Sequence, residues 1–282
     1  MYVIYITNKV IYITYMRWSG MELWITDRIQ LMLLLSACAV LSSLEAFVPL
    51  FQYQRGRWRR AVPNLALAFA VVLVNLTMAS ITAWLSAAVT RNHIGLLASF
   101  HSHPWVLATL GVAGLDLFAY LAHLLLHKVP LGWSFHRVHH SELEVDVTTA
   151  LRQHPGETLW RIFWQLLGTA VFGLPFWIVA LYLILSSLNA LLEHANVRMG
   201  GRFERWLRLL IVTSNMHKVH HSRQTSETDS NYSNIFSFWD RLYGTYTDRT
   251  NYNDLRYGLD GFDNNERQTL VGLLRLPFRS EY

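Results

Sequence analysis

The sequence predicts an all-α protein: a polytopic membrane helix bundle with a cytosolic, histidine-rich cap that holds two metal ions. Three observations support this fold class. The 282 residues are 52% hydrophobic and only 15% charged, which is too apolar for an ordinary soluble domain. Apolar runs long enough to cross a bilayer recur along the chain. Eight of the 13 histidines lie in three clusters whose spacing matches one face of a helix.

The apolar runs define the first elements in order. The first twenty residues lack the basic-then-apolar order of a signal peptide. We therefore expect residues 1–29 to be a poorly defined N-terminal extension, with Met21 opening a more ordinary N-terminus. Runs near 30–50, 63–89 and 105–127 are each long enough to span about 30 Å of hydrocarbon.

A fourth apolar stretch, 159–193, is interrupted. Gly173, Leu174 and Pro175 divide it into two segments, each near or below the usual spanning length of about 20 residues. This pattern predicts a tight hairpin that either spans the bilayer or only dips into it.

Lysine and arginine set the expected orientation through the positive-inside rule. Of the 24 basic residues, 19 lie in loop 52–62, in segment 128–158 and in the tail from residue 194, whereas the connector 90–104 has only Arg91. We therefore expect the connector outside and the basic segments in the cytosol. With this orientation, all three histidine clusters lie on the cytosolic face of a multi-pass membrane protein.

The histidine clusters carry the candidate chemistry. Residues three and four positions apart on a helix share a face, with Cβ atoms about 5–6 Å apart, so each cluster can aim two or three rings at one point. We expect the second and third clusters on short amphipathic helices at the membrane surface. The clusters are His123-x3-His127, His136-x2-His139-His140 and His217-x2-His220-His221.

The remaining histidines divide by position. His194 ends the predicted hairpin on the same face and is the candidate ninth ligand. His154 stands in a Pro-Gly turn, where a histidine often bonds only backbone, and both roles stay open for it. An ordinary interfacial role is expected of the three histidines in the outer connector, His93, His101 and His103.

Two polar residues share the helix face of His123. Asp116 and Tyr120 precede it by seven and three residues. A carboxylate inside a spanning helix is costly and usually faces a partner, so we expect Asp116 to orient a liganding imidazole through its free N–H. The alternative is an aspartate held by a neighbouring helix for packing alone.

Histidine must hold any metal, because the single cysteine, Cys38, excludes a cysteine-based zinc or iron–sulfur site. Eight or nine neutral imidazoles are too many for one ion but suit two. Imidazole binds iron as well as zinc and copper. Two irons beside a hydrocarbon bilayer favour dioxygen activation and attack on an unactivated C–H bond. We therefore predict two iron ions, with zinc as a substitute that the same ligands accept and dioxygen as co-substrate.

These motifs resemble the fatty acid hydroxylase and sterol desaturase superfamily of membrane di-iron enzymes, over residues 110 to 247. The resemblance implies a metal-ligand role for the eight clustered histidines and His194. The first histidine pair has a three-residue gap, which disfavours the fatty acid 2-hydroxylase branch, where four is usual. Asp116, Tyr120 and Asn196 are candidate catalytic residues. The motifs are Asp116-x3-Tyr120-x2-His123, Thr148-Thr-Ala-Leu-Arg-Gln-His-Pro-Gly-Glu157, His194-Ala-Asn196, Asn231-Tyr232 and Trp239-Asp-Arg-Leu-Tyr-Gly-Thr-Tyr246.

The last of these motifs has a structural interpretation. Trp239, Leu242 and Tyr243 stand at helical spacing, which predicts a helix face buried against the cap. Asp240 and Arg241 are expected to form an ion pair there.

The predicted function is a membrane-bound, oxygen-dependent di-iron oxidoreductase that hydroxylates or desaturates a lipid, such as a sterol, fatty-acyl chain or carotenoid. Both reactions use the same ligands, so both stay open. Four regions follow from this resemblance: an N-terminal extension (1–29), transmembrane helices with the outer connector (30–104), a catalytic domain (105–247) and a cytosolic tail (248–282).

The expected partners are a membrane lipid substrate and an external electron donor: a ferredoxin, a cytochrome b5-like protein or a reductase. The chain itself lacks the motifs that would collect electrons from a nicotinamide or an iron–sulfur cluster. Nucleic acid is not expected, because the arginines are scattered among apolar residues. The alternatives are a membrane metal transporter, which would call for polar residues through the bilayer, and a non-catalytic metal-binding membrane protein.

Overall fold

A computed structural model describes the backbone of residues 21–279 except positions 55, 101, 250 and 253, and the side chains from residue 31 onward. The extension expected at 1–29 lies largely outside the described residues. His101 lies outside them as well.

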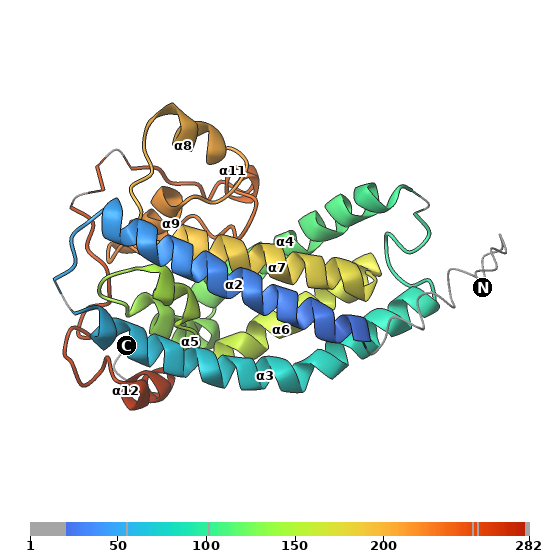
Figure 1. Ribbon diagram of the computed structural model, residues 1–282, viewed down its shortest axis with the longest axis horizontal. Helices are drawn as coiled ribbons and strands as arrows, with labels where there is room; N and C mark the ends of the chain where they lie inside the picture. Colours follow the sequence, from blue (N-terminus) through green and yellow to red (C-terminus); the bar gives the residue numbers. More distant parts are fainter. Residues whose placement is uncertain (1–20, 55, 101, 250, 253, 280–282) are drawn as a thin grey trace.

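Long helices running back and forth along one axis make up the body of the molecule (Figure 1). Two of them begin at an N-cap residue followed by proline, at His103–Pro104 and His154–Pro155, where the missing N–H of proline costs nothing. No strand occurs in the described part of the chain. The long helices are α2 (Met21–Phe47), α3 (Arg57–Arg91), α4 (Pro104–Lys128), α6 (Pro155–Phe172) and α7 (Phe176–His194).

Three of these helices, α3, α4 and α7, are long and apolar enough to cross a membrane. In α2, the stretch Leu31–Phe47 is a shorter apolar helix. Large apolar side chains along α3, such as Phe69, Leu76 and Trp84, point outward, as expected for a helix that faces lipid. The protein is therefore an all-α membrane bundle, as the sequence predicts.

The predicted hairpin is formed by α6 and α7. Its turn packs against the connector between α3 and α4, where the N–H groups of Leu96 and Leu97 donate to the carbonyls of Val171 and Phe172 at 2.9 and 3.0 Å. Gly173 adopts the left-handed conformation in this turn (φ 71°), which favours glycine. The hairpin thus returns to the end from which it started.

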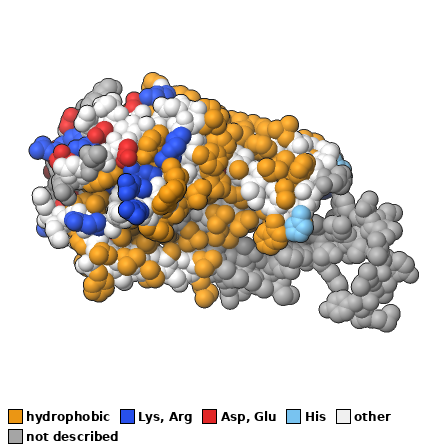
Figure 2. All heavy atoms as spheres, turned by 90° about the horizontal axis from the view of Figure 1, so that it is seen from above, with side chains coloured by type: hydrophobic (Ala, Val, Ile, Leu, Met, Phe, Trp, Pro, Cys, Tyr) orange, Lys and Arg blue, Asp and Glu red, His pale blue; other side chains and the backbone are white. Residues whose placement is uncertain are grey.

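That end carries the short helices and the charged residues. On the face drawn in Figure 2, Lys, Arg, Asp and Glu gather at one end, and apolar side chains cover much of the remaining described surface. We call it the histidine end. Its short elements are α5 (Pro130–His140), η1 (Val147–Leu151), α8 (Gly201–Leu207), α9 (Ser214–His220), α10 (Thr225–Thr228), α11 (Phe238–Leu242), α12 (Leu270–Arg275) and η2 (Leu276–Phe278).

Two expectations about these short elements are wrong. All seven residues of α9 are buried, so it is not a surface amphipathic helix; α7 and α10 pack around it. In α11, Leu242 and Tyr243 are exposed, and no Asp240–Arg241 ion pair forms. Asp240 instead accepts the N–H groups of Tyr232 and Ser233 at 2.7 and 3.0 Å, because the preceding loop folds back onto its carboxylate.

Candidate metal centre

Nine histidines converge at the histidine end in two groups, and the ligand atoms within each group lie within 4.8 Å of one another. These are the nine that the sequence singles out. They come from α4, α5, α7 and α9 and from His221, which directly follows α9. Site 1 comprises His123, His127, His136, His140 and His220, and site 2 comprises His139, His194, His217 and His221.

Each His-x-x-His-His motif serves both sites, and helix geometry explains the division. His136 and His140 are one turn apart on α5, so they face the same way, whereas His139 is rotated by about 100° from His140. The first two join site 1 and His139 joins site 2. In the second motif the division is reversed, with His220 in site 1 and His217 and His221 in site 2.

Backbone carbonyls determine the tautomer of four rings. A carbonyl oxygen only accepts, so a ring nitrogen bonded to it must carry the proton, and the other nitrogen keeps its lone pair. The pairs are His123 Nδ1 with Tyr232 O at 2.8 Å, His139 Nδ1 with Arg152 O at 3.1 Å, His194 Nδ1 with Ala190 O at 2.7 Å and His220 Nδ1 with Ser230 O at 2.7 Å. All four Nε2 lone pairs remain available as ligands.

Some of these lone pairs face each other directly. The Nε2 atoms of His139 and His194 are 3.0 Å apart, yet neither carries a proton that could form a hydrogen bond. His123 and His136 repeat this arrangement at 3.0 Å, because His136 Nδ1 lies 2.9 Å from a carboxylate oxygen of Glu157. Two opposed lone pairs repel unless a cation lies between them, so the donor set fits metal ions.

Burial keeps the rings neutral. Removal from water lowers the pKa of the histidines on α5 and around α9 well below the usual value, and neighbouring histidines add to the effect. Neutral imidazole is the form that binds metal. The affected residues are His136, His139, His140, His217, His220 and His221.

The two sites are adjacent. The rings of His140 and His221, one from each site, stack with centroids 4.7 Å apart, and those of His217 and His220 stack at 5.0 Å. Two ions held here would therefore be close neighbours in one buried centre.

Carboxylates near the rings escaped the sequence analysis. Glu157 contacts His136 and pairs with Arg161 at 2.8 Å, and Glu193 Oε1 lies 3.8 Å from His217 Nε2. Glu157 ends one of the motifs already noted, and Glu193 directly precedes another at His194. Asp229 lies 3.4 Å from His127 Nδ1, and no fixed spacing in the sequence announces this contact.

Two buried cations also escaped notice. Lys218, between the histidines of α9, donates from Nζ to the carbonyls of His194 and Ala195, and burial lowers its pKa to about 7. Arg152 donates to Val138 O at 2.9 Å and Ser141 Oγ at 2.8 Å. Its side chain therefore holds the end of α5 next to the Arg152 carbonyl, which bonds His139 Nδ1. Both cations fix the backbone that carries ligand rings.

Asp116 does not orient an imidazole, contrary to expectation. Its carboxylate accepts the N–H groups of Ile235 and Phe236 at 3.0 and 2.9 Å and the indole N–H of Trp239 at 3.1 Å. The buried carboxylate is bonded by the loop before α11 and by Trp239 of α11. Asp116 thus anchors that loop against α4.

Tyr120 likewise holds the chain after α11 rather than reaching the ligand rings. Its hydroxyl bonds Thr245 Oγ1 at 2.9 Å, and its ring stacks on Tyr243 at 5.2 Å. Tyr120 shares the face of His123 but lies about one turn earlier on α4, so its side chain meets Tyr243 and Thr245 instead of the histidine rings.

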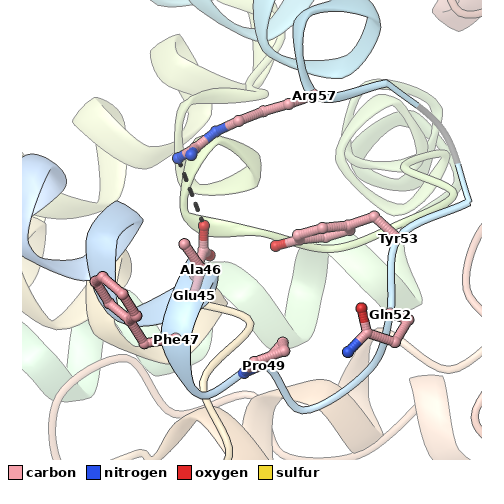
Figure 3. Close-up of a pocket in the computed structure, with 7 residues that line it drawn as sticks. All are labelled: Glu45, Ala46, Phe47, Pro49, Gln52, Tyr53 and Arg57. Atoms are coloured by element: carbon pink, nitrogen blue, oxygen red, sulfur yellow. Dashed lines mark ion pairs between the residues drawn. The ribbon is translucent and has the colours of Figure 1, made fainter.

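Asn196 clips the chain after α2 to the end of α7. Its side chain donates to Phe51 O at 2.9 Å and accepts from Phe51 N–H at 3.1 Å, while its own N–H donates to Glu45 at 2.8 Å. Glu45 borders a pocket of about 340 Å³ (Figure 3), across which Arg57 faces it at 3.9 Å. Asn196 is thus one layer removed from the metal centre.

His154 takes the backbone role considered for it, and the described histidines of the outer connector lie away from the two sites. His154 Nδ1 accepts the N–H of Gly156 at 3.0 Å and caps α6. His103 caps α4 at the opposite end of the bundle. His93 lies in the connector at that same end.

Fold and site together define a class of protein: a membrane helix bundle with two adjacent, buried, all-histidine sites suited to metal ions. Residues 108–245 match the fatty acid hydroxylase family. This segment belongs to the fatty acid hydroxylase superfamily, in agreement with the resemblance seen in its motifs.

Characterised relatives align over about half of this chain. Alkylglycerol monooxygenase of Xenopus tropicalis is 31% identical over 144 residues, covering 50% of this chain and 30% of the relative. The human alkylglycerol monooxygenase is 34% identical over 146 residues, with shares of 50% and 30%. Ornithine lipid hydroxylase OlsE of Rhizobium tropici is 30% identical over 156 residues, with shares of 52% and 46%. The chain thus spans less than half the length of these relatives. No solved structure matches the chain.

Proposed function

We propose that this protein is a membrane-bound, oxygen-dependent di-iron oxidoreductase that hydroxylates or desaturates a lipid. The observation that carries the proposal is the convergence of nine buried histidines in two adjacent groups. Relatives named as a monooxygenase and a hydroxylase of lipids support the reaction class.

The ring nitrogens of site 2 are close enough for one ion to bind them together: the Nε2 atom of His194 lies 3.0 Å from those of His139 and His217 and 3.1 Å from that of His221. Imidazole binds iron as well as zinc. Zinc has no redox chemistry, so a reaction that reduces dioxygen favours iron. Bound iron would supply the reduction of dioxygen and the cleavage of a C–H bond.

The chain's own residues prepare the centre. Backbone carbonyls orient four rings, burial keeps the rings neutral, and the packed histidine end excludes bulk water. Exclusion of water protects a reactive centre from side reactions. A lipid substrate is available directly from the bilayer around α3, α4 and α7.

The packing between the spanning helices argues against the transporter alternative. Val112 and Leu115 of α4 pack with Leu174, Ile178 and Val179 in one apolar cluster. An ion path would need polar groups at this depth. A non-catalytic metal-binding protein is distinguished from the proposed enzyme by measuring activity.

Metal content is the first test. Protein purified from iron-replete cells is expected to contain two iron ions per chain. His220→Ala and His217→Ala, one in each site, should each lower this content, whereas His103→Ser at the other end of α4 should leave it unchanged. At most one ion per chain in the wild-type protein would contradict the proposal.

Activity is tested on lipids of membranes that contain the wild-type protein or the His220→Ala variant. Mass spectrometry should reveal, with the wild-type protein only, a lipid with one added oxygen or with two fewer hydrogens. The first product identifies hydroxylation and the second desaturation. Identical lipid profiles in the two membranes would favour the non-catalytic alternative.

We further propose that the histidine end faces the cytosol and receives electrons there. Inserting one oxygen atom from dioxygen into a C–H bond and reducing the other to water consumes two external electrons, and desaturation with reduction of dioxygen to two waters also needs two. The net charge of +5 favours an acidic donor such as a ferredoxin or cytochrome b5-like protein.

The electron donor is tested by reconstitution. Protein in lipid vesicles with dioxygen and NADPH should turn over only after a reductase chain is added. The His220→Ala variant should stay inactive in both conditions. Sustained turnover without a reductase would refute this requirement.

A further inference from the structure

Two segments of the histidine end form a single surface, which we call the shelf: residues 201–212 with α8, and residues 235–243 with α11. They lie side by side above the bundle (Figure 1). Val212 N–H donates to Ile235 O at 2.9 Å, and Ser237 bonds the carbonyls of Leu210 and Arg208 at 3.2 and 2.6 Å. These bonds make the two segments one unit.

The shelf is attached beside the membrane-spanning part of α4, deeper in the bundle than the histidines. Ile235, Phe236 and Trp239 bond Asp116, which precedes His123 by seven residues, or about 10 Å along the helix. Inside the bundle, Ile235 packs in the apolar cluster of α4 and α7. A surface at this depth lies at the level of the bilayer.

The outward side of the shelf is apolar. Phe203, Trp206, Leu210 and Leu242 are 71%, 70%, 66% and 67% exposed. Leaving such a group of large apolar side chains in water is unfavourable. Patches of this kind mark contact surfaces.

Charge on the shelf indicates which contact this is. Arg202 and Arg205 of α8 are exposed beside the aromatic residues, whereas its acidic residue, Glu204, is turned inward to Arg208 at 2.5 Å and Thr213 at 2.7 Å. Aromatic and basic residues on the outside of a short helix are typical of the membrane interface. Seen from above α8, apolar side chains continue from the charged end onto the bundle (Figure 2).

We propose that the shelf inserts into the phospholipid leaflet at the histidine end, with its apolar side chains at the acyl boundary and Arg202 and Arg205 at the lipid phosphates. The occupant is the leaflet itself, because the shelf continues the lipid-facing surface of the spanning helices. The inference concerns membrane contact and does not depend on the metal or on catalysis.

The test places a fluorescent label on the shelf. In a Cys38→Ser background, Trp206→Cys and Leu242→Cys receive an environment-sensitive fluorophore, and Asp260→Cys, an exposed position, serves as the matched control. The proteins are reconstituted in vesicles of phosphatidylcholine with some phosphatidylglycerol. Labels at 206 and 242 should emit at shorter wavelength and be quenched by doxyl groups on the lipid chains. The label at 260 should be quenched only by aqueous iodide.

Two outcomes would overturn the proposal. Labels at 206 and 242 that are quenched by iodide and not by doxyl lipid would place the shelf in water. Labels in an apolar environment that neither quencher reaches would mean that a protein, such as a second copy, covers the shelf. Leu210→Cys replaces Trp206→Cys if the latter does not fold, as judged by its thermal unfolding midpoint.

Discussion

The chemistry of this centre depends on which nitrogen of each imidazole carries the proton. At His139 and His194 a backbone carbonyl holds the proton on Nδ1, so their Nε2 lone pairs meet at 3.0 Å. His136 differs, because its Nδ1 lies against the carboxylate of Glu157. An anionic acceptor makes a ligand more basic than a carbonyl does, and such outer contacts tune metal binding strongly.

Glu157→Gln tests this role. The substitution keeps the size of the side chain but removes its charge, and iron affinity should fall by about 10- to 100-fold. The affinity is measured by competition with a soluble chelator, and the iron that stays bound to the protein is followed by its absorption spectrum.

Glu204→Gln is the matched control for that variant. Glu204 is also buried and also pairs with an arginine one turn later, Arg208, but the pair contacts no ligand histidine. The Glu204→Gln variant should bind iron with the affinity of the wild-type protein, even if the variant unfolds at a lower temperature. Equal iron affinity of the Glu157→Gln variant and the wild type would refute the proposed positioning role.

At the scale of elements, the arrangement depends on short helices held by long ones. α5 and α9 each send rings to both sites, so a small rotation of either helix would disturb both. Arg152 fixes the end of α5, and Lys218 ties α9 to the end of α7. The α6–α7 hairpin in turn positions His194, and its depth depends on the turn at Gly173.

Gly173→Ala should destabilise the hairpin. Its positive φ of 71° is strained for any residue with a Cβ, and a Cβ there would meet the carbonyl oxygen of Ile94. We expect a loss of about 1–3 kcal/mol, seen as a lower thermal unfolding midpoint in detergent.

Gly200→Ala provides the comparison for the hairpin variant. It has nothing within 4 Å of the added Cβ and an ordinary extended backbone, with φ −136°, so its midpoint should stay close to that of the wild type. If Gly173→Ala and Gly200→Ala unfold at the same temperature, the turn does not carry the strain described.

At the scale of the whole molecule, the bundle separates two ends of different character. The α3–α4 connector and the hairpin turn meet at one end, and the nine histidines of the two candidate sites meet at the other. Apolar packing between α4 and α7 fills the space between them. The proposed enzyme therefore has its centre at one membrane surface, where lipid and an electron donor are both accessible.

Cysteine labelling tests this separation across a membrane. In a Cys38→Ser background, Ser102→Cys in the connector and Asp260→Cys at the histidine end are both exposed. A membrane-impermeant maleimide added to intact cells should label position 102, and position 260 only after permeabilisation. Labelling of both from the same side would contradict a bundle that crosses the bilayer, and the reverse pattern would invert the proposed orientation.

The sequence by itself determined the helices, their apolar character and the histidines that come together. These features depend on residues close in the chain: run length sets a span, and spacing of three and four sets a helix face. The gathering of the clusters at one end followed from counting crossings.

Only the tertiary structure decided which ring belongs to which site and what Asp116, Tyr120 and Asn196 do. Each of these three residues depends on a partner more than a hundred residues away: Asp116 bonds Ile235, Tyr120 bonds Thr245, and Asn196 bonds Phe51. A helix face indicates the direction in which a side chain points, but its contact depends on which loop folds over that face. Packing of distant segments therefore makes Asp116, Tyr120 and Asn196 anchors of loops, while the histidines come together as their local spacing predicts.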